Sequence, residues 1–540
     1  MELAKNQEHT VTIEGYGEGG MGVARIDGRV VFVHGALRGE KCRVLILKTL
    51  KSVAFAKVLE VIEPSSERIT PDCPYFPRCG GCTYRHIRYE EELRLKKQRV
   101  QDNLSRIGGS DVTVEEILGA QDTLRYRNKA QYPVSKDGAV GFYRARTHEV
   151  IECEHCLLVR PEADAAAEAL REYMQSCRVA GYDEKTGRGL VRHLYVRSNA
   201  AGESLICVLV NGDRLPKEDR LVTLLRDACP ECAGIVLGTN TKKGNVILGD
   251  RYRTLWGSDR LEDTLCGKTF RLSVPSFYQV NRAQAERLYA KTIEFADLTG
   301  QETVLDLYCG AGTITLALSD HAKKVLGAEI VPEAIDDARE NAARNGIANA
   351  EFHVGATEEL LPKLVENGLR PDVIVLDPPR KGCDPAVLQA IIAAAPKRVV
   401  YVSCGAPTLA RDAKLLAEGG YAAEKVQCVD MFCWTGAVET VMSLVQQNPD
   451  DIVKVGIDAD ELAVTKAESK ATYGEIQARV KEQTGLNVTP LYIAQVKRKH
   501  GIIERECYNK AKSESAKMLI CPPDKEKAIE DALRFFGMIA

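Results

Sequence analysis

The fold of this chain is decided by the stretch Val304-Leu305-Asp306-Leu307-Tyr308-Cys309-Gly310-Ala311-Gly312. An apolar strand runs into a glycine turn, and an apolar run after the turn predicts a helix. Glycines at such a turn let a ligand approach the backbone, and the N-terminus of the next helix offers free N–H groups. The stretch therefore predicts a ligand-binding edge of an α/β sheet.

Strands and helices alternate regularly around this turn. Strands are expected at 303–307, 324–328 and 373–376, and helices at 284–295, 314–318 and 332–345. Such alternation predicts a doubly wound parallel sheet, that is, an α/β Rossmann-like domain.

An acidic residue follows the glycine turn at the distance that a nucleoside requires. Glu329 ends the second strand about 20 residues on, where its carboxylate can accept both hydroxyls of a ribose. A dinucleotide is the competing ligand, but the third glycine of its fingerprint is absent, since Thr313 follows Gly312. Downstream, Asp377-Pro378-Pro379 ends another apolar strand, as in methyltransferases that present a planar base to a methyl donor, the adenine N6 class included.

A cysteine ends the strand expected at 398–402. Cys404 is either a nucleophile or a structural thiol, and the residues alone leave both readings open, because a free thiol with a pKa of about 8.5 is mostly protonated at neutral pH.

The rest of the chain indicates a modular protein. Its 540 residues predict about three or four domains, and its net charge of −3 excludes a uniformly basic surface. No apolar run approaches the roughly 20 residues that span a bilayer, and the first residues show no signal peptide, so a cytoplasmic protein without membrane contact is expected. Strand-like runs with glycine clusters at 10–63 predict a small β-barrel, a helix is expected at 89–107, and mixed patterns at 120–275 indicate an α+β domain.

The last 90 or so residues predict a helical appendage. Helix starts are expected at Thr472, at Thr489-Pro490 and at Asp524, with a stop at Gly485. The run Val496-Lys497-Arg498-Lys499-His500 suits either a helix-turn-helix contact to RNA or an ordinary helix C-terminus.

Eighteen cysteines in a chain without an export signal favour metal ligands and core thiols over disulfides. Three of them, Cys73, Cys79 and Cys82, are clustered, with Cys153 and Cys156 as candidates for a fourth ligand. Four thiolates suit zinc or an iron-sulfur cluster. Cys229 and Cys232 lack partners at metal spacing and are expected to be plain thiols.

Several motifs together carry a family resemblance. They are Gln279 within 276–281, Asp306–Gly310, Asp377–Gly382, Ser403-Cys404, and Asp430–Phe432 followed by Glu439-Thr440. In order and spacing, residues from about 10 to 445 resemble the RNA uracil-5-methyltransferase family. The resemblance implies an S-adenosyl-L-methionine-dependent enzyme in which Cys404 adds to C6 of a uracil and Glu439 removes the C5 proton. It further implies cofactor-binding roles for Gln279, Tyr308, Glu329 and Asp377.

Two departures from the family pattern are visible. The family commonly follows its cysteine with Asn-Pro-x-Thr, whereas Gly405-Ala406-Pro407-Thr408 stands here. The usual Pro-x-Thr-x-His-x-Glu appears as Cys433 to Glu439 without its proline and histidine.

The resemblance also implies the remaining features of the chain. It favours a [4Fe-4S] cluster over zinc, held by Cys73, Cys79, Cys82 and Cys156. The barrel resembles a TRAM domain, an OB-like fold. The expected domains are a TRAM-like barrel at 1–64, a middle RNA-binding domain at 65–275, the methyltransferase domain at 276–448 and a helical extension at 449–540. Barrel and cysteines together favour 23S ribosomal RNA over transfer RNA as substrate, with the protein as a monomer.

Residues 124–146 interleave basic and aromatic side chains. They are Arg125, Arg127, Lys129, Lys136, Arg144 and Arg146 with Tyr126, Tyr132, Phe142 and Tyr143. This composition suits unpaired RNA, although a solvated charged face is the alternative. The target uridine would be flipped into a pocket between this segment and the sheet.

The leading hypothesis is therefore methylation of C5 of uridine in structured RNA. The alternatives are a transfer RNA uracil-5-methyltransferase, an adenine N6-methyltransferase that needs no cysteine, and a catalytically weakened RNA-binding or ribosome assembly factor, which the two altered loops would explain.

Overall fold

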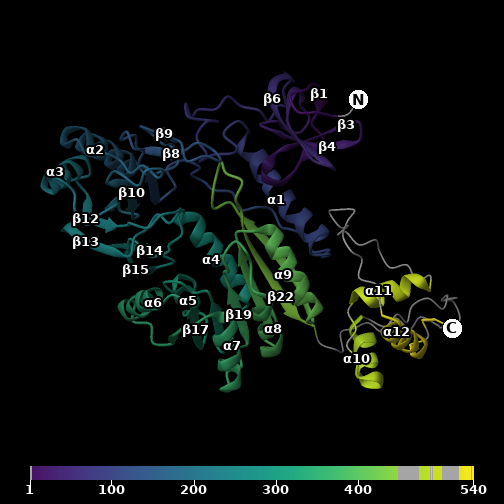
Figure 1. Cartoon of the computed structure of the whole chain (residues 1–540). Helices are drawn as coiled ribbons and strands as arrows, with labels where there is room; N and C mark the ends of the chain where they lie inside the picture. The colour runs from purple at the N-terminus through teal and green to yellow at the C-terminus, as the bar shows by residue number, and fades with distance from the viewer. Residues whose placement is uncertain are drawn as a thin grey trace. The chain divides into compact units, whose positions relative to one another are not determined.

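The computed structural model describes residues 3–447, 473–486, 488, 490–500, 522–536 and 538–539. The chain forms two compact units, Met1–Pro449 and Asp450–Ala540 (Figure 1). In the described part of the chain, no helix is long and apolar enough to cross a membrane. The three domain boundaries expected at 64, 275 and 448 stay predictions.

The N-terminal part is a six-stranded β structure, as expected. Its strands, in the order β1-β5-β6-β4-β3-β2, are β1 (Glu8–Thr12), β5 (Lys41–Thr49), β6 (Val53–Glu63), β4 (Arg29–His34), β3 (Gly22–Ile26) and β2 (Gly15–Tyr16). Alternate residues point inward, so that Val31, Val33 and Val44 are fully buried in its core. The barrel expected from the alternating runs is confirmed.

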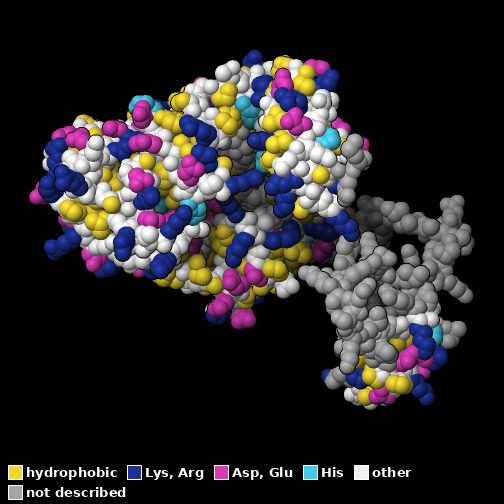
Figure 2. Space-filling view, turned by 45° about the horizontal axis from the view of Figure 1, so that its top comes forward, with side chains coloured by type: hydrophobic (Ala, Val, Ile, Leu, Met, Phe, Trp, Pro, Cys, Tyr) yellow, Lys and Arg dark blue, Asp and Glu magenta, His cyan; other side chains and the backbone are white. Residues whose placement is uncertain are grey.

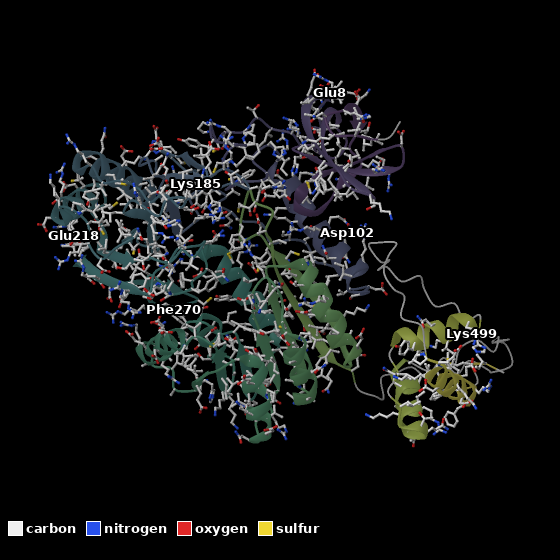
Figure 3. The ribbon with its side chains drawn as sticks, in the orientation of Figure 1. Glu8, Asp102, Lys185, Glu218, Phe270 and Lys499 are labelled. Atoms are coloured by element: carbon white, nitrogen blue, oxygen red, sulfur yellow. The ribbon has the colours of Figure 1, made fainter. Side chains whose placement is uncertain are left out.

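A single long helix connects this barrel to the rest of the unit. Helix α1 (Tyr89–Arg106) has the bounds expected from its apolar spacing to within one residue. Its buried Val100 and Leu104 join the core of the large sheet, while Leu95 packs toward the barrel with Leu37. Figure 1 shows α1 between the barrel and α9 (Ala406–Glu418), and Asp102 in Figure 3 marks its C-terminal half.

The middle of the unit is mixed α and β, as expected. A five-stranded sheet has the order β13 (Arg251–Gly257), β12 (Cys232–Thr239), β11 (Ser204–Val210), β10 (Val191–Ser198) and β7 (Lys129–Pro133). Helices α2 (Pro161–Cys177) and α3 (Glu218–Ala228) pack on it through one apolar core. Two hairpins complete it: β8 (Gly141–Tyr143) with β9 (Val150–Glu152), and β14 (Arg260–Leu265) with β15 (Lys268–Ser273).

The large sheet has seven strands in the order β18-β17-β16-β19-β20-β22-β21. They are β18 (Ala350–Val354), β17 (Lys324–Glu329), β16 (Thr303–Leu307), β19 (Val373–Leu376), β20 (Arg398–Ser403), β22 (Glu439–Gln446) and β21 (Tyr421–Val429). The first five are parallel, but β22 runs antiparallel to both β20 and β21. The expected doubly wound parallel sheet is confirmed, and at this edge it is extended by the antiparallel hairpin of β21 and β22.

Helices cover both faces of the large sheet. On one face lie α4 (Arg282–Ala296), α5 (Thr313–Leu318) and α6 (Pro332–Arg344). On the other lie α7 (Thr357–Glu366), α8 (Pro385–Ala394) and α9, together with α1. This doubly wound arrangement buries both faces, as parallel strands require, and leaves the carboxyl ends of the strands free to form a site.

The C-terminal unit contains α10 (Tyr473–Thr484), α11 (Pro490–Lys499) and α12 (Pro523–Phe535) around one small core that includes Ile476, Ile493 and Ile529. The helix starts expected at Thr472 and Thr489 lie outside the described residues. Lys499 pairs with Glu526 and His500 with Glu530 of α12, and the choice between an RNA contact and a simple helix end stays a prediction.

Candidate active site

The glycine turn after β16 has the strained backbone that its sequence demands. Gly310 and Gly312 have φ of 53° and 81°, which side chains other than glycine rarely adopt. A Cβ at Gly312 would come within 3.1 Å of the Ala338 Cβ, whereas no atom lies within 4 Å of a Cβ at Gly310. The turn is thus closely packed at its helix end and open at its strand end, where a ligand can approach.

Glu329 lies beside this turn, as predicted. Its two carboxylate oxygens accept hydrogen bonds from the backbone N–H groups of Gly310 (3.2 Å) and Val331 (3.0 Å). These bonds hold the carboxylate at the end of β17 and leave lone pairs for a diol. The side chains that follow it, Ile330 and Val331, are 62% and 46% exposed, and so form an apolar rim beside the carboxylate.

A second carboxylate at the turn was missed by the sequence interpretation. Asp306 is fully buried, and its Oδ2 accepts a hydrogen bond from Thr315 (2.6 Å). Its Oδ1 has no hydrogen-bond partner in the described part of the chain. Burial raises the pKa of Asp306 to about 7, and the Asp377 carboxylate contributes. A buried acid on the first strand is the signal that could have identified it.

The pairing of β20 with β22 brings the proposed nucleophile and base together. Ser403 pairs with Thr440 in antiparallel register. Cys404 follows Ser403 and Glu439 precedes Thr440, so the two residues stand opposite each other at the same end of the sheet. Asp377, directly after the neighbouring β19, reaches the same edge. Three residues from three separate motifs therefore meet at one point.

These groups perturb one another's protonation. Burial raises the pKa of the Cys404 thiol, the carboxylates of Glu439 and Asp377 raise it further, and the Arg380 guanidinium lowers it. Burial also raises the pKa of Glu439, again with a contribution from Asp377 and against Arg380. A carboxyl group with a raised pKa can accept a proton and retain it near neutral pH.

Arg380 is a further residue that the sequence interpretation did not assign. It follows the Asp-Pro-Pro motif and lines the same cavity as Cys404. Because it is the nearby cation that favours both the thiolate and the carboxylate, it belongs to the electrostatic setting of the site. Its position directly after the Asp-Pro-Pro motif is the sequence signal that could have identified it.

The two other residues predicted to bind the cofactor are Tyr308 and Gln279. Tyr308 has φ of 65°, a strained value for a side chain of its size, and its hydroxyl lies near Cys383 and Thr357. Gln279 is 7% exposed and precedes α4, where its backbone carbonyl accepts a hydrogen bond from Asn128 (2.9 Å). Their roles toward a cofactor stay predictions.

The segment before Glu439 is anchored where the family proline is missing. Trp434 is 9% exposed, has φ of 66°, and its indole N–H donates to the carbonyl of Thr123 (3.0 Å). Its carbonyl accepts hydrogen bonds from the N–H groups of Thr83 and Tyr84, and the Arg85 guanidinium lies 4.6 Å from its ring centroid. These contacts hold the segment in place one residue after Cys433, which stands where the family has its proline.

The loop after Cys404 also has a regular form. Gly405 is the N-cap of α9, and Pro407 lies in the first turn of that helix, where its missing N–H causes no loss. The Thr408 hydroxyl donates to the carbonyl of Gly405 (2.9 Å). The shifted proline therefore starts a helix directly behind the thiol.

Five cysteines surround a second cavity of about 280 Å³: Cys73, Cys79, Cys82, Cys153 and Cys156. Burial raises the pKa of Cys82 and of Cys153, and in both cases the neighbouring thiols Cys156, Cys79 and Cys73 contribute. In the described residues, however, no three His, Cys, Asp or Glu side chains are grouped so that they could hold a metal ion. The thiols share one cavity without converging on one point.

The basic segment 124–146 divides into buried and exposed members. Arg125 binds Asp164 (2.7 Å), and Tyr132, fully buried, donates to the same carboxylate (3.0 Å). Tyr132 belongs to the core of the middle sheet, so the expectation that it contacts RNA was wrong, whereas 36% of the Arg125 side chain stays exposed. Arg146 is exposed, and Lys136 is exposed in the same segment.

Comparisons with known proteins identify a family and a domain in this chain. The family described as tRNA (Uracil-5-)-methyltransferase matches residues 88–447, and the TRAM domain matches residues 3–59. Relatives named as uncharacterized RNA methyltransferases occur in Clostridium acetobutylicum (43% identical; 82% of this chain and 97% of the relative) and Halalkalibacterium halodurans (44%; 82% and 98%).

A solved structure is also similar to this chain. It is the Pyrococcus abyssi tRNA (uracil-54, C5)-methyltransferase in complex with S-adenosyl-L-homocysteine, with a TM-score of 0.66 and 25% identity. The match covers 81% of this chain and all of that one.

Proposed function

This chain belongs to the tRNA (uracil-5-)-methyltransferase family, and on that premise we propose that it methylates C5 of uridine in 23S ribosomal RNA through a covalent bond between Cys404 and C6. The family and the fold make it an S-adenosyl-L-methionine-dependent RNA methyltransferase. The observation that supports the covalent route is the register of β20 and β22, which sets Cys404 opposite Glu439.

The proposed reaction begins at Cys404. Its thiolate forms a bond to C6, and the electrons of the C5–C6 double bond move toward O4, so that C5 becomes nucleophilic. S-adenosyl-L-methionine supplies the methyl group to C5 and leaves as S-adenosyl-L-homocysteine. Glu439 then takes the C5 proton, the double bond re-forms, and the thiolate of Cys404 departs.

The electrostatics of the site support these roles. A base is most effective when its pKa lies near the working pH, and burial with Asp377 raises the pKa of Glu439 in that direction. Arg380 opposes the raised pKa of Cys404 and so favours the thiolate. Both groups remain in place despite the altered loops, which argues against a catalytically weakened assembly factor.

The test of the covalent route uses RNA labelled with tritium at C5 of uridine. The native protein should release tritium, Cys404→Ala should release none, and Glu439→Gln should accumulate a protein–RNA adduct that survives denaturing electrophoresis. Methylation that persists in Cys404→Ala would refute the covalent route and favour adenine N6 chemistry.

Ribosomal RNA is proposed as the substrate because a TRAM domain and a cysteine-lined cavity stand beside the methyltransferase fold. Transfer RNA is the alternative, since the similar archaeal structure is named for transfer RNA. Mass mapping of both RNA classes from a deletion strain decides: a methyl group missing from one or two 23S uridines supports the proposal, and one missing only from transfer RNA refutes it.

The cysteine cavity is proposed to hold a [4Fe-4S] cluster through Cys73, Cys79, Cys82 and Cys156. The donor set fits in chemistry, because four thiols share one cavity whose walls include Arg85, Arg127 and Lys129, and these cations suit anionic thiolates. Such a cluster would supply a structural staple between segments far apart in the sequence. Iron and zinc analysis of anaerobically purified protein, with Cys153→Ala as the control variant, tests the assignment; zinc without iron would refute it.

A further inference from the structure

A large cavity of the first unit extends well beyond the reacting groups. We name it the α1 groove: it is lined by Gly15–Gly17 and Arg38 of the barrel, by α1 residues between Glu91 and Ile107, by Cys404–Pro407 and by Gly436-Ala437. Its volume is about 1240 Å³. Pockets for single drug-sized ligands measure about 300 to 1,000 Å³, so the groove has room for more than one flipped nucleotide.

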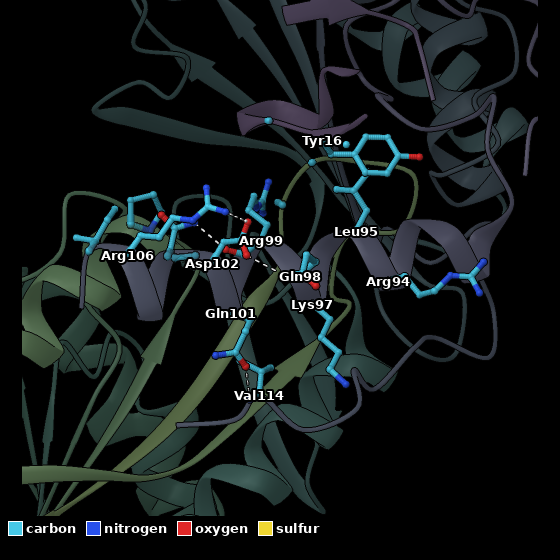
Figure 4. Close-up of a pocket in the computed structure, with 18 of the residues that line it drawn as sticks. Tyr16, Arg94, Leu95, Lys97, Gln98, Arg99, Gln101, Asp102, Arg106 and Val114 are labelled. Atoms are coloured by element: carbon cyan, nitrogen blue, oxygen red, sulfur yellow. Dashed lines mark hydrogen bonds and ion pairs between the residues drawn. The ribbon is translucent and has the colours of Figure 1, made fainter. Parts of the chain in front are cut away.

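One side of helix α1 faces this groove along its whole length. Glu91, Leu95, Gln98, Asp102 and Arg106 line it at intervals of three or four residues, which places them on one helical face. In Figure 4, Arg99 and Arg106 extend from α1 on the side where Tyr16 of the barrel lies. Figure 2 shows Lys and Arg side chains gathered along the hollow that crosses this face of the molecule.

Most cations of the groove already have a carboxylate partner. Arg94 binds Glu91 (2.8 Å), Arg38 binds the same carboxylate (3.5 Å), and Arg106 binds Asp102 (3.4 Å). Lys97 is likewise paired with Glu116. Among the described residues, Arg99 and Arg380 are the cations of the groove that form no such ion pair. Arg380 acts on Cys404 and Glu439, so Arg99 is the cation of the two that is available to a ligand away from the reacting groups.

Arg99 lies against the segment that leads to Glu439. Its Nη1 is 3.9 Å from the point where a Cβ of Gly436 would stand. Gly436 and Ala437 present almost no side chain, and this is where the chain lacks the family histidine. The guanidinium thus borders an open part of the groove that also reaches Cys404.

The chemistry of the groove favours an unpaired nucleic acid strand. A free guanidinium recognises phosphate with two parallel hydrogen bonds. The half-buried ring of Tyr16, with Arg38 above it at 6.0 Å, offers a stacking surface for a base. We propose that the α1 groove binds the RNA strand next to the target uridine, and that Arg99 contacts a phosphate of that strand. This inference rests on the proposed function, because it takes RNA to be the substrate.

The test compares Arg99→Gln with two control variants of the full-length protein. Arg106→Gln removes a groove cation that is already paired, and Lys414→Gln removes an exposed cation of α9 outside the groove. Binding of labelled oligouridine is measured by fluorescence anisotropy over a range of salt concentrations. Arg99→Gln should weaken binding about tenfold and lower the salt slope by about one charge, with little change in either control. The conservative variant Arg99→Lys keeps the charge and should therefore retain most of the salt dependence that Arg99→Gln loses.

Several outcomes would overturn the inference. Unchanged affinity and salt slope in Arg99→Gln would overturn it. So would an Arg99→Gln variant that binds oligouridine normally and loses affinity only for an RNA duplex or for an acidic peptide. Methylation assays keep the two proposals apart: if Arg99→Gln raises the KM for RNA at unchanged kcat, the groove is supported. Oligouridine binding that depends on Arg99 without any C5 methylation would refute the proposed function and leave the groove intact.

Discussion

Replacement of Lys96 by methionine is the sharpest test of how the segment before Glu439 is held. Lys96 is fully buried and its ammonium donates to Glu92 (2.6 Å), to Asp430 (2.6 Å) and to the carbonyl of Phe432 (3.1 Å). Glu92 in turn accepts the backbone N–H of Trp434 (2.7 Å). One cation of α1 therefore joins the helix to the segment that leads to the proposed base.

The variant is expected to lose much of its free energy of unfolding, because two buried carboxylates would remain without their cation. Removal of one partner of a buried ion pair destabilises proteins by about 3–5 kcal/mol. Lys97→Met is the matched control one residue along the same helix: its partner Glu116 is 90% exposed, and an exposed pair contributes about 1 kcal/mol or less. Urea unfolding, followed through Trp434 fluorescence in a Trp256→Phe background, measures both variants.

The pH dependence of this loss has a definite sign. Burial raises the pKa of Glu92 and Lys96 lowers it, so the variant raises that pKa further. An acid whose pKa is higher in the folded than in the unfolded protein stabilises the fold while it is protonated. This stabilisation is complete below the unfolded pKa and is lost as the pH rises through the folded pKa. The deficit of Lys96→Met should therefore grow by up to about 1.4 kcal/mol per pH unit above neutrality. A loss below about 1 kcal/mol, or no larger than that of Lys97→Met, would refute the reasoning.

Three further predictions follow from single contacts. Arg380→Met should slow alkylation of Cys404 by iodoacetamide up to about tenfold at neutral pH, since loss of the cation raises the thiol pKa; an unchanged rate would count against the electrostatic role. Gly312→Ala should lower stability in thermal unfolding by about 1–3 kcal/mol, and Gly346→Ala, with positive φ but no neighbour within 4 Å, should cost less. Ile529→Ala should cost the C-terminal unit about 2–5 kcal/mol, measured by its susceptibility to limited proteolysis.

Local patterns predicted several of the elements that form the candidate site. The glycine turn, the strand that ends in Glu329 and the helix at 89–107 were all recognisable, because each depends on side chains within a few residues of one another. Tyr132 shows where this reasoning fails. Its surroundings in the sequence resemble an RNA-binding surface, yet its hydroxyl binds Asp164 in a core that only the packed sheet creates.

The sequence by itself determined which chemical groups this protein has and on which elements they stand: a strand-end thiol, a glycine turn, an acid after the second strand and a clustered set of cysteines. Tertiary structure alone decided which of them meet. The antiparallel return of β22 places Glu439 opposite Cys404, and Lys96 reaches Asp430 across 334 residues of chain. Periodicity reports the local backbone, whereas such pairings depend on long-range strand register and on burial, which no short stretch of sequence encodes.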